Sequence, residues 1–281
     1  MNRTGQRPRV LGIADAELIL EGLDTDPVTD VFLDSRLRPQ LAAGHLTDTV
    51  MGCRAPDRSV SLCWLGANVV PTANTTPDAA GAYAEQVRTT GMWFSSLWGP
   101  RQPVAQMWAH LRTDVRAPRA IRDPQQFMAL TGDPLVAPDP DVVRIGPGDF
   151  DEYYAASVEF SIEELGSSPE AFGGGSYYRA RVRSLIESGH AFGRFENGEL
   201  VAKADLALVT SSATQVQGVW VRRRNRGRGL AAPVVSAACA VARAEIAPTV
   251  TLYVNDFNIA ARRTYARLGF VETAAFMTLL W

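Results

Sequence analysis

The sequence predicts an α/β protein, in the sense of mixed helices and strands (α+β), that is divided into two domains. Its 281 residues are 46% apolar, which is enough to bury two separate cores. Helical periodicity alternates with short β-branched runs along the chain. Residues 131–140 (TGDPLVAPDP) contain three prolines, each of which removes a backbone donor and restricts the residue before it. We therefore expect domains at 1–135 and 141–281, with the boundary in this segment.

The N-terminal half gives signals for helices and strands but no motif that indicates a binding or catalytic site. An apolar β-rich run predicts a strand at Val60 to Leu65, and helical patterns predict helices at Pro77 to Thr90 and near Pro103 to Arg112. The phrases GANVVP (66–71) and SSLWGP (95–100) read as strand ends that pass into turns, where Gly and Pro are more often turn residues than ligand contacts. No internal repeat is visible in the sequence, although a diverged duplication is compatible with it. The function of residues 1–135 is unknown from this pattern.

The C-terminal half gives clearer signals for secondary structure. Helices are expected at Phe150 to Leu165 and at Tyr177 to Ser188. Asn197-Gly198 separates two strand patterns, which is a strong hairpin signal. The alternating run 214–221 (TQVQGVWV) then predicts a strand with one more polar face.

The remaining elements follow from turn and cap signals. The strand 214–221 leads into RRRNRGRG (222–229) and a helical run of small and apolar residues, in which Pro233 falls in the first turn, where no amide hydrogen is needed. The run TVTLYV (249–254) predicts a strand. Asn258 is suited to cap a helix at Ile259 to Leu268, and Gly269 to stop it. Residues 270–281 predict a closing hairpin or strand.

Composition excludes several broad classes. The formal charge of −2 gives no general attraction to nucleic acid or to anionic membranes. Cys53, Cys63 and Cys239 follow no metal-ligand spacing, and no uncharged apolar stretch is long enough to span a membrane. We expect a cytoplasmic protein, a monomer or homodimer, with no metal, no nucleic-acid partner and no membrane partner.

The turn before the predicted helix at 231 carries the clearest chemical signal. A helix N-terminus offers unpaired amides and a positive dipole end to an anion, and glycines remove the Cβ atoms that would hold a diphosphate away. Arginines beside the turn add charge. This combination predicts a pyrophosphate site at the six residues Arg226, Gly227, Arg228, Gly229, Leu230 and Ala231.

Three other interpretations of the turn are weaker. A dinucleotide fold needs a third glycine and an acidic residue at the end of the next strand, where this chain has Asn255. A Walker loop needs GK[ST] after its glycines, which is absent. An RNA-binding patch is compatible with the arginines, but the run is short and has no interleaved aromatic residues.

Two motifs in order resemble the GNAT superfamily of N-acetyltransferases. They are V-x-x-x-x-R-G-R-G-L-A (221–231) and, after the strand LYVN, N-x-x-A-x-x-x-Y-x-R-L-G-F (258–270). The resemblance implies a GNAT fold for 141–281, with a mixed, mostly antiparallel twisted sheet flanked by helices. The whole chain also resembles an actinobacterial two-domain type, on the phrases DPVTDVFLDSRL (26–37), GANVVP, SSLWGP, QVQGVWV and LYVNDFN. In that type the N-terminal domain is uncharacterised, and a diverged GNAT-like fold is expected for it.

The resemblance also implies roles for named residues. Acetyl-CoA, the implied co-substrate, is expected to contact the main chain of Val219, Trp220 and Val221 and the pyrophosphate turn. Tyr265 is implied as the general acid beside the coenzyme sulfur, although a core aromatic is the alternative. Asn258 is implied to contact the cofactor or its ordered water, a role compatible with capping.

The general base is not obvious from the sequence. Many family members carry a glutamate on the strand before the turn, where this chain has Gln215 and Gln217. A water chain is one possibility; Glu163, Glu164, Asp205 and the terminal carboxylate of Trp281 are others, and Lys203 with Asp205 is equally compatible with an ion pair.

The expected function is transfer of an acyl group, most simply acetyl, from its CoA thioester to the amine of a small molecule, peptide or protein. A catalytically silent acyl-CoA sensor is the alternative.

Overall fold

The chain forms two compact units in a computed structural model that describes residues 7–281. Unit 1 contains the described residues up to Met128, together with 253–258 and 272–281. Unit 2 contains 129–252 and 259–271. The units therefore interleave along the chain, and the division into domains at 1–135 and 141–281 stays a prediction.

Unit 1 begins with a short strand and two helices, and continues through three strands to a second pair of helices. In chain order its elements are β1 (Arg9–Leu11), η1 (Ile13–Asp15), α1 (Ala16–Thr25), α2 (Val31–Ala42), β2 (Thr49–Arg54), β3 (Val60–Leu65), β4 (Asn68–Pro71), α3 (Pro77–Thr90), β5 (Ser96–Pro100), α4 (Arg101–Leu111) and β6 (Ala120–Leu130).

Unit 2 repeats this order. The elements that follow in the chain are β7 (Val142–Arg144), η2 (Pro147–Asp149), α5 (Phe150–Leu165), η3 (Ala171–Gly173), α6 (Gly175–Glu187), β8 (Ala191–Glu196), β9 (Glu199–Val209), β10 (Ala213–Val221), η4 (Arg223–Asn225), α7 (Ala231–Glu245), β11 (Thr249–Asn255), α8 (Ile259–Leu268) and β12 (Val271–Leu280). The end of β11 and nearly all of β12 belong to unit 1. Apart from η3 and η4, the two series match element by element, so the fold contains the duplication that the sequence does not display.

The order of the strands repeats as well. In unit 1 the strands follow the order β1-β2-β3-β4-β5, and in unit 2 the order is β7-β8-β9-β10-β11. The parallel pairs are β4 with β5 and β10 with β11, whereas the other pairs within these two runs are antiparallel. The predicted fold class, a mixed and mostly antiparallel α/β (α+β) protein in two parts, is confirmed.

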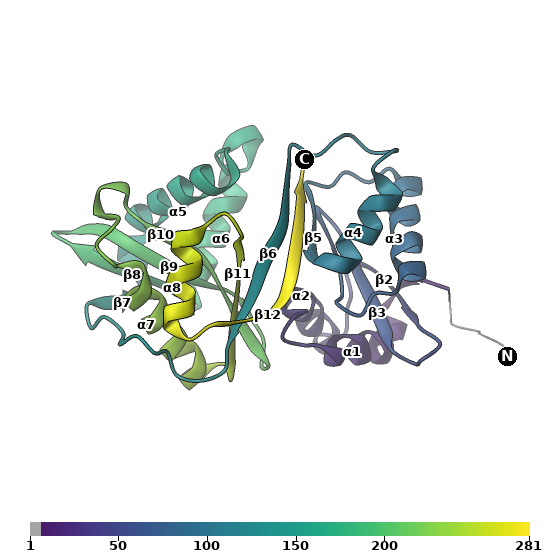
Figure 1. The fold of residues 1–281 in the computed structure, drawn as a ribbon, viewed down its shortest axis with the longest axis horizontal. Helices are drawn as coiled ribbons and strands as arrows, with labels where there is room; N and C mark the ends of the chain where they lie inside the picture. Colours follow the sequence, from purple (N-terminus) through teal and green to yellow (C-terminus); the bar gives the residue numbers. More distant parts are fainter. Residues whose placement is uncertain (1–6) are drawn as a thin grey trace. The chain divides into compact units, whose positions relative to one another are not determined.

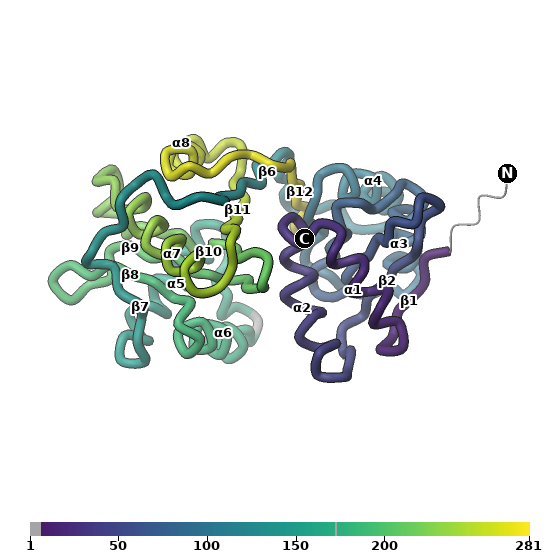
Figure 2. Tube along the Cα trace, turned by 90° about the horizontal axis from the view of Figure 1, so that it is seen from below, coloured from purple at the N-terminus to yellow at the C-terminus, as the bar shows by residue number. Residues whose placement is uncertain are grey.

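Helices cover both faces of each sheet (Figures 1 and 2). In unit 2, α7 and α8 lie on one face and α5 and α6 on the other. In unit 1, α3 and α4 lie on one face and α1 and α2 on the other. One core of unit 1 forms between α3, α4 and the strands and includes Tyr83, Met107 and Leu97; the core under α5 and α6 includes Tyr153 and Trp220. Burial of these apolar faces drives the layering.

Local capping chemistry sets several element ends where the sequence predicted them. The Thr76 side chain accepts from the Ala79 N–H at the start of α3, and Gly91 at its end has φ of 59°. Gly166 (φ 73°) ends α5. The hairpin residues Asn197 and Gly198 are both left-handed, with φ of 53° and 80°, as a two-residue turn between twisted strands requires. These predictions are confirmed.

The segment 270–281, predicted as a hairpin or a strand, contains the single strand β12. It pairs antiparallel with β5 from Phe276↔Pro100 to Leu280↔Ser96, within unit 1. Leu279 is fully buried there. Residues 276–280 thus extend the strand order of unit 1 beyond β5.

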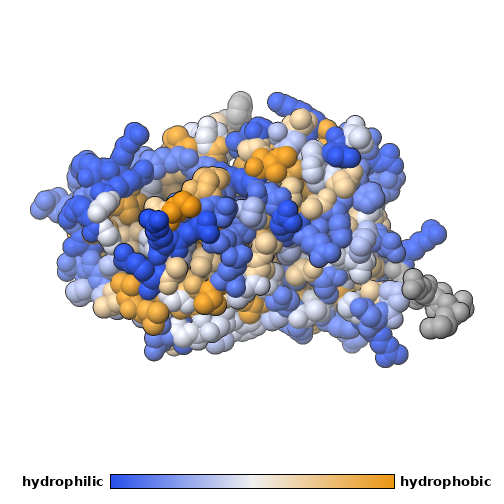
Figure 3. All heavy atoms as spheres, in the orientation of Figure 1, coloured by the Kyte–Doolittle hydropathy of each residue, from blue (hydrophilic) through white to orange (hydrophobic). Residues whose placement is uncertain are grey.

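The surface shows no large apolar sector on the face drawn in Figure 3, where apolar side chains form small separate groups among polar ones. Individual exposed apolar side chains include Trp93, Tyr177 and Phe257. None of the helices within residues 7–281 is long and apolar enough to cross a membrane.

Candidate functional site

The site predicted from the sequence lies where β10 parts from β11. The two strands pair in parallel only from Ala213↔Thr249 to Gln215↔Thr251, but β10 continues to Val221. Beyond Gln215, the β10 edge away from β9 has no strand partner within unit 2. Backbone groups along this stretch are therefore available to a ligand.

The turn after β10 has the geometry of an anion cradle. Gly227 and Gly229 are left-handed, with φ of 79° and 78°, and a Cβ built on either would meet nothing within 4 Å. The turn leads directly into the 15-residue helix α7, whose first-turn amides have no acceptor within the helix. Among the described residues, no backbone carbonyl accepts from the amides of residues 227–230. The turn therefore presents unpaired N–H groups to open space.

Arginines surround this turn, and most of them are paired with carboxylates. The Nη1 and Nη2 atoms of Arg228 lie 2.8 and 3.0 Å from the two oxygens of Glu196, an arrangement that lowers the pKa of that carboxyl. The other ion pairs of the run are Arg222 with Glu152, Arg224 with Glu199 and Arg226 with Glu163. The positive charge of residues 222–228 is thus largely balanced by glutamates from α5, β8 and β9.

The three predicted strand contacts lie at the end of β10. Trp220 is buried in the core beneath α5 and α6, while Val219 and Val221 are half-buried. Because the Trp220 side chain is committed to the core, a ligand at this strand would meet its backbone, as the sequence interpretation assumed.

Tyr265 lies on α8 in unit 2 and is nearly fully buried. Burial, with a smaller contribution from the Glu164 charge, holds the pKa of its phenol well above the usual range. Its ring meets that of Phe270 edge-on at 6.1 Å. The phenol is therefore held as a neutral acid, which is the state a proton donor needs.

Asn258 directly precedes α8, and its amide donates to the Asn255 carbonyl at 2.9 Å. The Asn255 side chain accepts from buried Gln125 Nε2 at 2.9 Å, and Gln125 Oε1 in turn accepts from Thr278 Oγ1 at 2.6 Å. This network of unit 1 fixes the turn before α8. The roles of Asn258, Tyr265 and the turn in binding or catalysis stay predictions.

The candidate bases have different surroundings. Glu164 carries the charge that acts on Tyr265, whereas Glu163 is paired with Arg226. Gln215 and Gln217 bind each other, with Gln217 Nε2 donating to Gln215 Oε1 at 2.8 Å. Trp281 accepts from Arg119 Nε at 3.1 Å and packs in unit 1.

A buried ionic network lies behind β10. The sequence indicated its Lys203–Asp205 ion pair as one alternative, but not its contacts with Tyr153 and Gly218. Lys203 and Asp205 form an ion pair at 3.0 Å, with Lys203 1% exposed. The Tyr153 hydroxyl donates to Asp205, and Lys203 Nζ donates to the carbonyl of Gly218 at 3.1 Å. The sequence signal that could have indicated the last contact is a glycine inside a strand, which often marks a bulge or a close approach.

In unit 1 the turn at the equivalent place, between β4 and α3, has its amides bound by side chains of the protein itself. It joins β4 to α3 through residues 72–76 without a glycine, and its Ala73 amide donates to both oxygens of buried Asp30, at 3.0 and 3.3 Å. Pro77 opens α3 without an amide hydrogen, and the Ala79 amide is capped by Thr76. The duplicated fold therefore keeps an open cradle in unit 2 and a closed one in unit 1.

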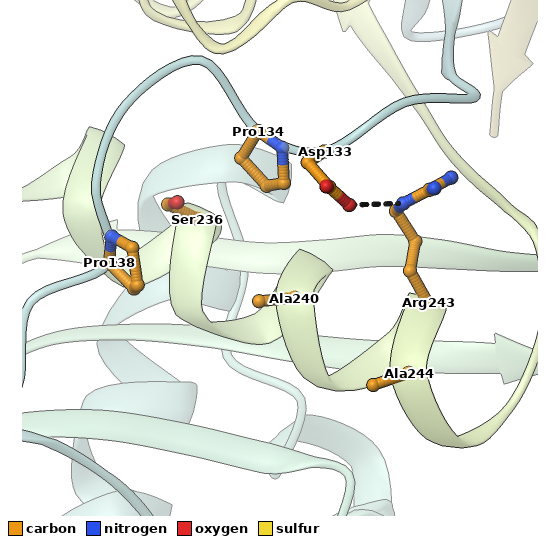
Figure 4. Close-up of a pocket in the computed structure, with 7 residues that line it drawn as sticks. All are labelled: Asp133, Pro134, Pro138, Ser236, Ala240, Arg243 and Ala244. Carbon is orange, nitrogen blue, oxygen red and sulfur yellow. Dashed lines mark ion pairs between the residues drawn. The ribbon is translucent and has the colours of Figure 1, made fainter.

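A separate cavity of about 310 Å³ lies between the segment 133–138 and α7 (Figure 4). Its Ser236 hydroxyl donates to the Val136 carbonyl at 2.5 Å, and Arg243 faces Asp133 across it. The lining residues are Asp133, Pro134, Pro138, Ser236, Ala240, Arg243 and Ala244. None of the predicted site residues lines this cavity. Within residues 7–281, no group of three or more His, Cys, Asp or Glu side chains is arranged to hold a metal ion.

Two family models match separate parts of the chain. Residues 159–270 match the model described as "Acetyltransferase (GNAT) family". Residues 49–153 match a "Domain of unknown function (DUF4081)". No curated protein matches the chain.

Solved structures resemble nearly the whole chain. A GCN5-related N-acetyltransferase from Sphaerobacter thermophilus is 18% identical with a TM-score of 0.62, and the match covers 97% of this chain and 95% of that one. A tandem GNAT protein from the clavulanic acid biosynthesis pathway is 16% identical with a TM-score of 0.57, covering 97% and 98%. A GNAT-family acetyltransferase from Colwellia psychrerythraea is 12% identical with a TM-score of 0.55, covering 98% and 99%. At these identities the likeness establishes the fold alone, and the tandem relative agrees with the repeated order of elements.

Proposed function

Because residues 159–270 belong to the acetyltransferase (GNAT) family, we propose that the chain transfers an acyl group, in the first place acetyl, from its CoA thioester to an amine. The observation that carries the proposal is the turn 226–231. It combines two left-handed glycines, open space around them and unpaired amides at the start of a 15-residue helix. Diphosphates bind such helix starts through backbone N–H groups and the helix dipole.

The residues present fit the coenzyme. Gly227 and Gly229 leave room for the pyrophosphate, and Arg226 and Arg228 offer guanidinium groups at either side. The unpaired edge of β10 near Val219 to Val221 offers main-chain groups to the amides of the pantetheine arm. Asn258 is assigned to the same ligand by its place before α8.

The chemistry requires one bond to form and one to break. The acceptor nitrogen bonds to the acetyl carbon, the carbon–sulfur bond breaks, and its electron pair leaves with the sulfur. Tyr265, whose raised pKa keeps its phenol protonated, gives the proton that converts the thiolate to the thiol. The amine loses a proton in exchange, which a water chain or a carboxylate such as Glu164 on α5 receives.

One observation favours the alternative of a silent acyl-CoA sensor. The β10 positions at which many related enzymes carry a glutamate hold Gln215 and Gln217, and these two amides bind each other. Neither side chain takes up a proton at ordinary pH. Release of free CoA thiol in the presence of an amine library would support transfer, whereas tight acetyl-CoA binding with no release over any amine would support the sensor.

The test is titration calorimetry with acetyl-CoA, free CoA and longer acyl-CoAs, using wild type, Gly229→Glu and Gly44→Glu. Both glycines are left-handed (φ 78° and 74°) with open space around them, so the two substitutions introduce the same charge and the same backbone strain. We expect Gly229→Glu to weaken acetyl-CoA binding at least about 100-fold, because a carboxylate would stand where the diphosphate binds. Gly44→Glu should leave it unchanged.

Absence of binding to every CoA ester by wild type would contradict the proposal. Equal losses in both variants would mean that strain, and not the cradle, decides binding.

A further inference from the structure

The buried network behind β10 contains an ion pair, and two charges are costly to remove from water. Lys203 and Asp205 lie on β9, and the Lys203 ammonium also faces the rings of Tyr153 at 4.7 Å and Phe160 at 5.7 Å. Burial lowers the pKa of Lys203, and the neighbouring Asp205 opposes this change. Replacing a buried ion pair by apolar residues of similar size is often neutral or stabilising, so such a pair is weak evidence for a purely structural role.

The ammonium reaches one peptide of β10 in particular. Pairing of β10 with β9 is interrupted between Gln217 and Trp220, so the Gly218–Val219 peptide stands outside the ladder. Lys203 Nζ donates to the Gly218 carbonyl at 3.1 Å. The interruption lies within the stretch of β10 that β11 does not pair, which is where the proposed thioester contacts lie.

Close packing makes this arrangement specific. Gly218 has φ of 59°, and a Cβ at this position would collide with the Asp205 carboxylate and lie 2.8 Å from Lys203 Nζ. Only glycine therefore lets the peptide approach the ion pair so closely. The bulge at Gly218 and the Lys203–Asp205 ion pair therefore depend on each other sterically.

The planar trans peptide links the two sides of this contact. The carbonyl of Gly218 and the N–H of Val219 belong to the same peptide plane and point in opposite directions. Since the carbonyl faces the ammonium, the Val219 N–H faces away from it. A cation on the carbonyl oxygen also polarises the peptide and strengthens its N–H as a donor.

We propose that Lys203 is a positioning residue that fixes and polarises the Val219 N–H so that this amide binds the thioester carbonyl oxygen. This inference rests on the proposed function. Preorganised donors directed at an oxygen that gains negative charge contribute strongly to acyl transfer. Asp205 and Tyr153 hold the ammonium in place.

The test measures the carbonyl itself and not turnover. Infrared difference spectra of acetyl-CoA labelled with ¹³C at the carbonyl would be recorded in buffer, bound to wild type, and bound to Lys203→Met/Asp205→Asn. This double variant removes both charges together. The amide oxygen introduced by Asp205→Asn can still accept a hydrogen bond from the Tyr153 hydroxyl. The matched control is Arg144→Met/Glu245→Gln, which removes an exposed ion pair of the same unit.

We expect the bound carbonyl band at lower wavenumber than in buffer for wild type and the control, and back toward its buffer position for the double variant, with similar affinity by calorimetry. An unchanged band in a folded double variant that binds acetyl-CoA would overturn the inference and leave the proposed function intact. No binding by wild type would instead remove the proposed function.

A second measurement needs only wild type. The amide proton of Val219 should move downfield when acetyl-CoA binds and not when free CoA, which has no acetyl carbonyl, binds. Equal shifts with both ligands would also overturn the inference.

Discussion

Arg226 and Glu163 are joined by an ion pair of 2.5 Å between the glycine-rich turn and α5, with both side chains nearly half exposed. Arg226 Nε also donates to the Val221 carbonyl at 2.9 Å. The guanidinium that we assign to the pyrophosphate is thus already held by a carboxylate. A bound diphosphate and Glu163 would therefore share, or compete for, the same cation.

Glu163→Gln is expected to tighten acetyl-CoA binding, because it removes the competing charge. The gain should be at most about fivefold, since exposed ion pairs contribute only about 0.2–1 kcal/mol. Calorimetry at low and moderate salt measures it, and the difference from wild type should shrink as salt rises. Glu159→Gln, an exposed position on the same helix, is the control and should have little effect. Weaker binding by Glu163→Gln would show that Glu163 orients Arg226 rather than competing with the ligand.

Tyr265→Phe is expected to lower kcat by about 100-fold or more while leaving the affinity for acetyl-CoA nearly unchanged, because general acids contribute about 10²–10⁴-fold. Steady-state kinetics with an acceptor found by thiol release, together with calorimetry, separates the two effects. Tyr177→Phe, at an exposed tyrosine of α6, is the control. Equal kcat in both variants would assign Tyr265 to the core.

The pH dependence of the same reaction offers a separate check. Burial raises the pKa of Tyr265, so its protonated form persists above the ordinary pKa of tyrosine, about 10. The kcat of wild type should therefore show no fall attributable to phenol ionisation up to pH 10. An alkaline loss below that pH that disappears in Tyr265→Phe would contradict the raised pKa of the phenol.

Asp30→Asn tests the filled turn of unit 1. Burial raises the pKa of Asp30 well above its usual value, so the folded state binds a proton at a pH where the unfolded state does not. Wild type should gain stability relative to Asp30→Asn as pH falls through the raised folded pKa toward about 3.9, the ordinary value. Urea unfolding at several pH values measures the difference. Asp78→Asn, at an exposed carboxylate in the same unit, is the control, and a difference that is flat with pH would contradict the expectation.

Elements with local stop and start signals could be predicted from the sequence, and elements defined by distant partners could not. The helices α3, α5 and α8 have the bounds that their sequence patterns predicted, and Gly269 directly follows α8 as expected. By contrast, α2 buries the consecutive residues Val31, Phe32 and Leu33 and contains Pro39, so it has little helical periodicity to detect.

The features of the candidate site also separate into those set by local sequence and those set by distant partners. The glycines of 226–231 are a local pattern and could be recognised directly. The duplication could not, because the turn 72–76 contains no glycine and the Asp30 side chain, from a distant part of the chain, accepts from its Ala73 amide. The contact of Lys203 with Gly218 depends on a break in strand register, which residue types alone do not specify.

The place of β12 has a consequence for synthesis on the ribosome. Residues 271–280 pair with β5, yet they are made about 170 residues after it, so unit 1 cannot complete its sheet cotranslationally until they emerge. Leu97 and the other core residues beside this strand remain partly uncovered during that interval. Removing residues 271–281 would therefore harm the first unit made, and a fragment that ends after α4 or β6 should be prone to aggregate through the exposed edge of β5.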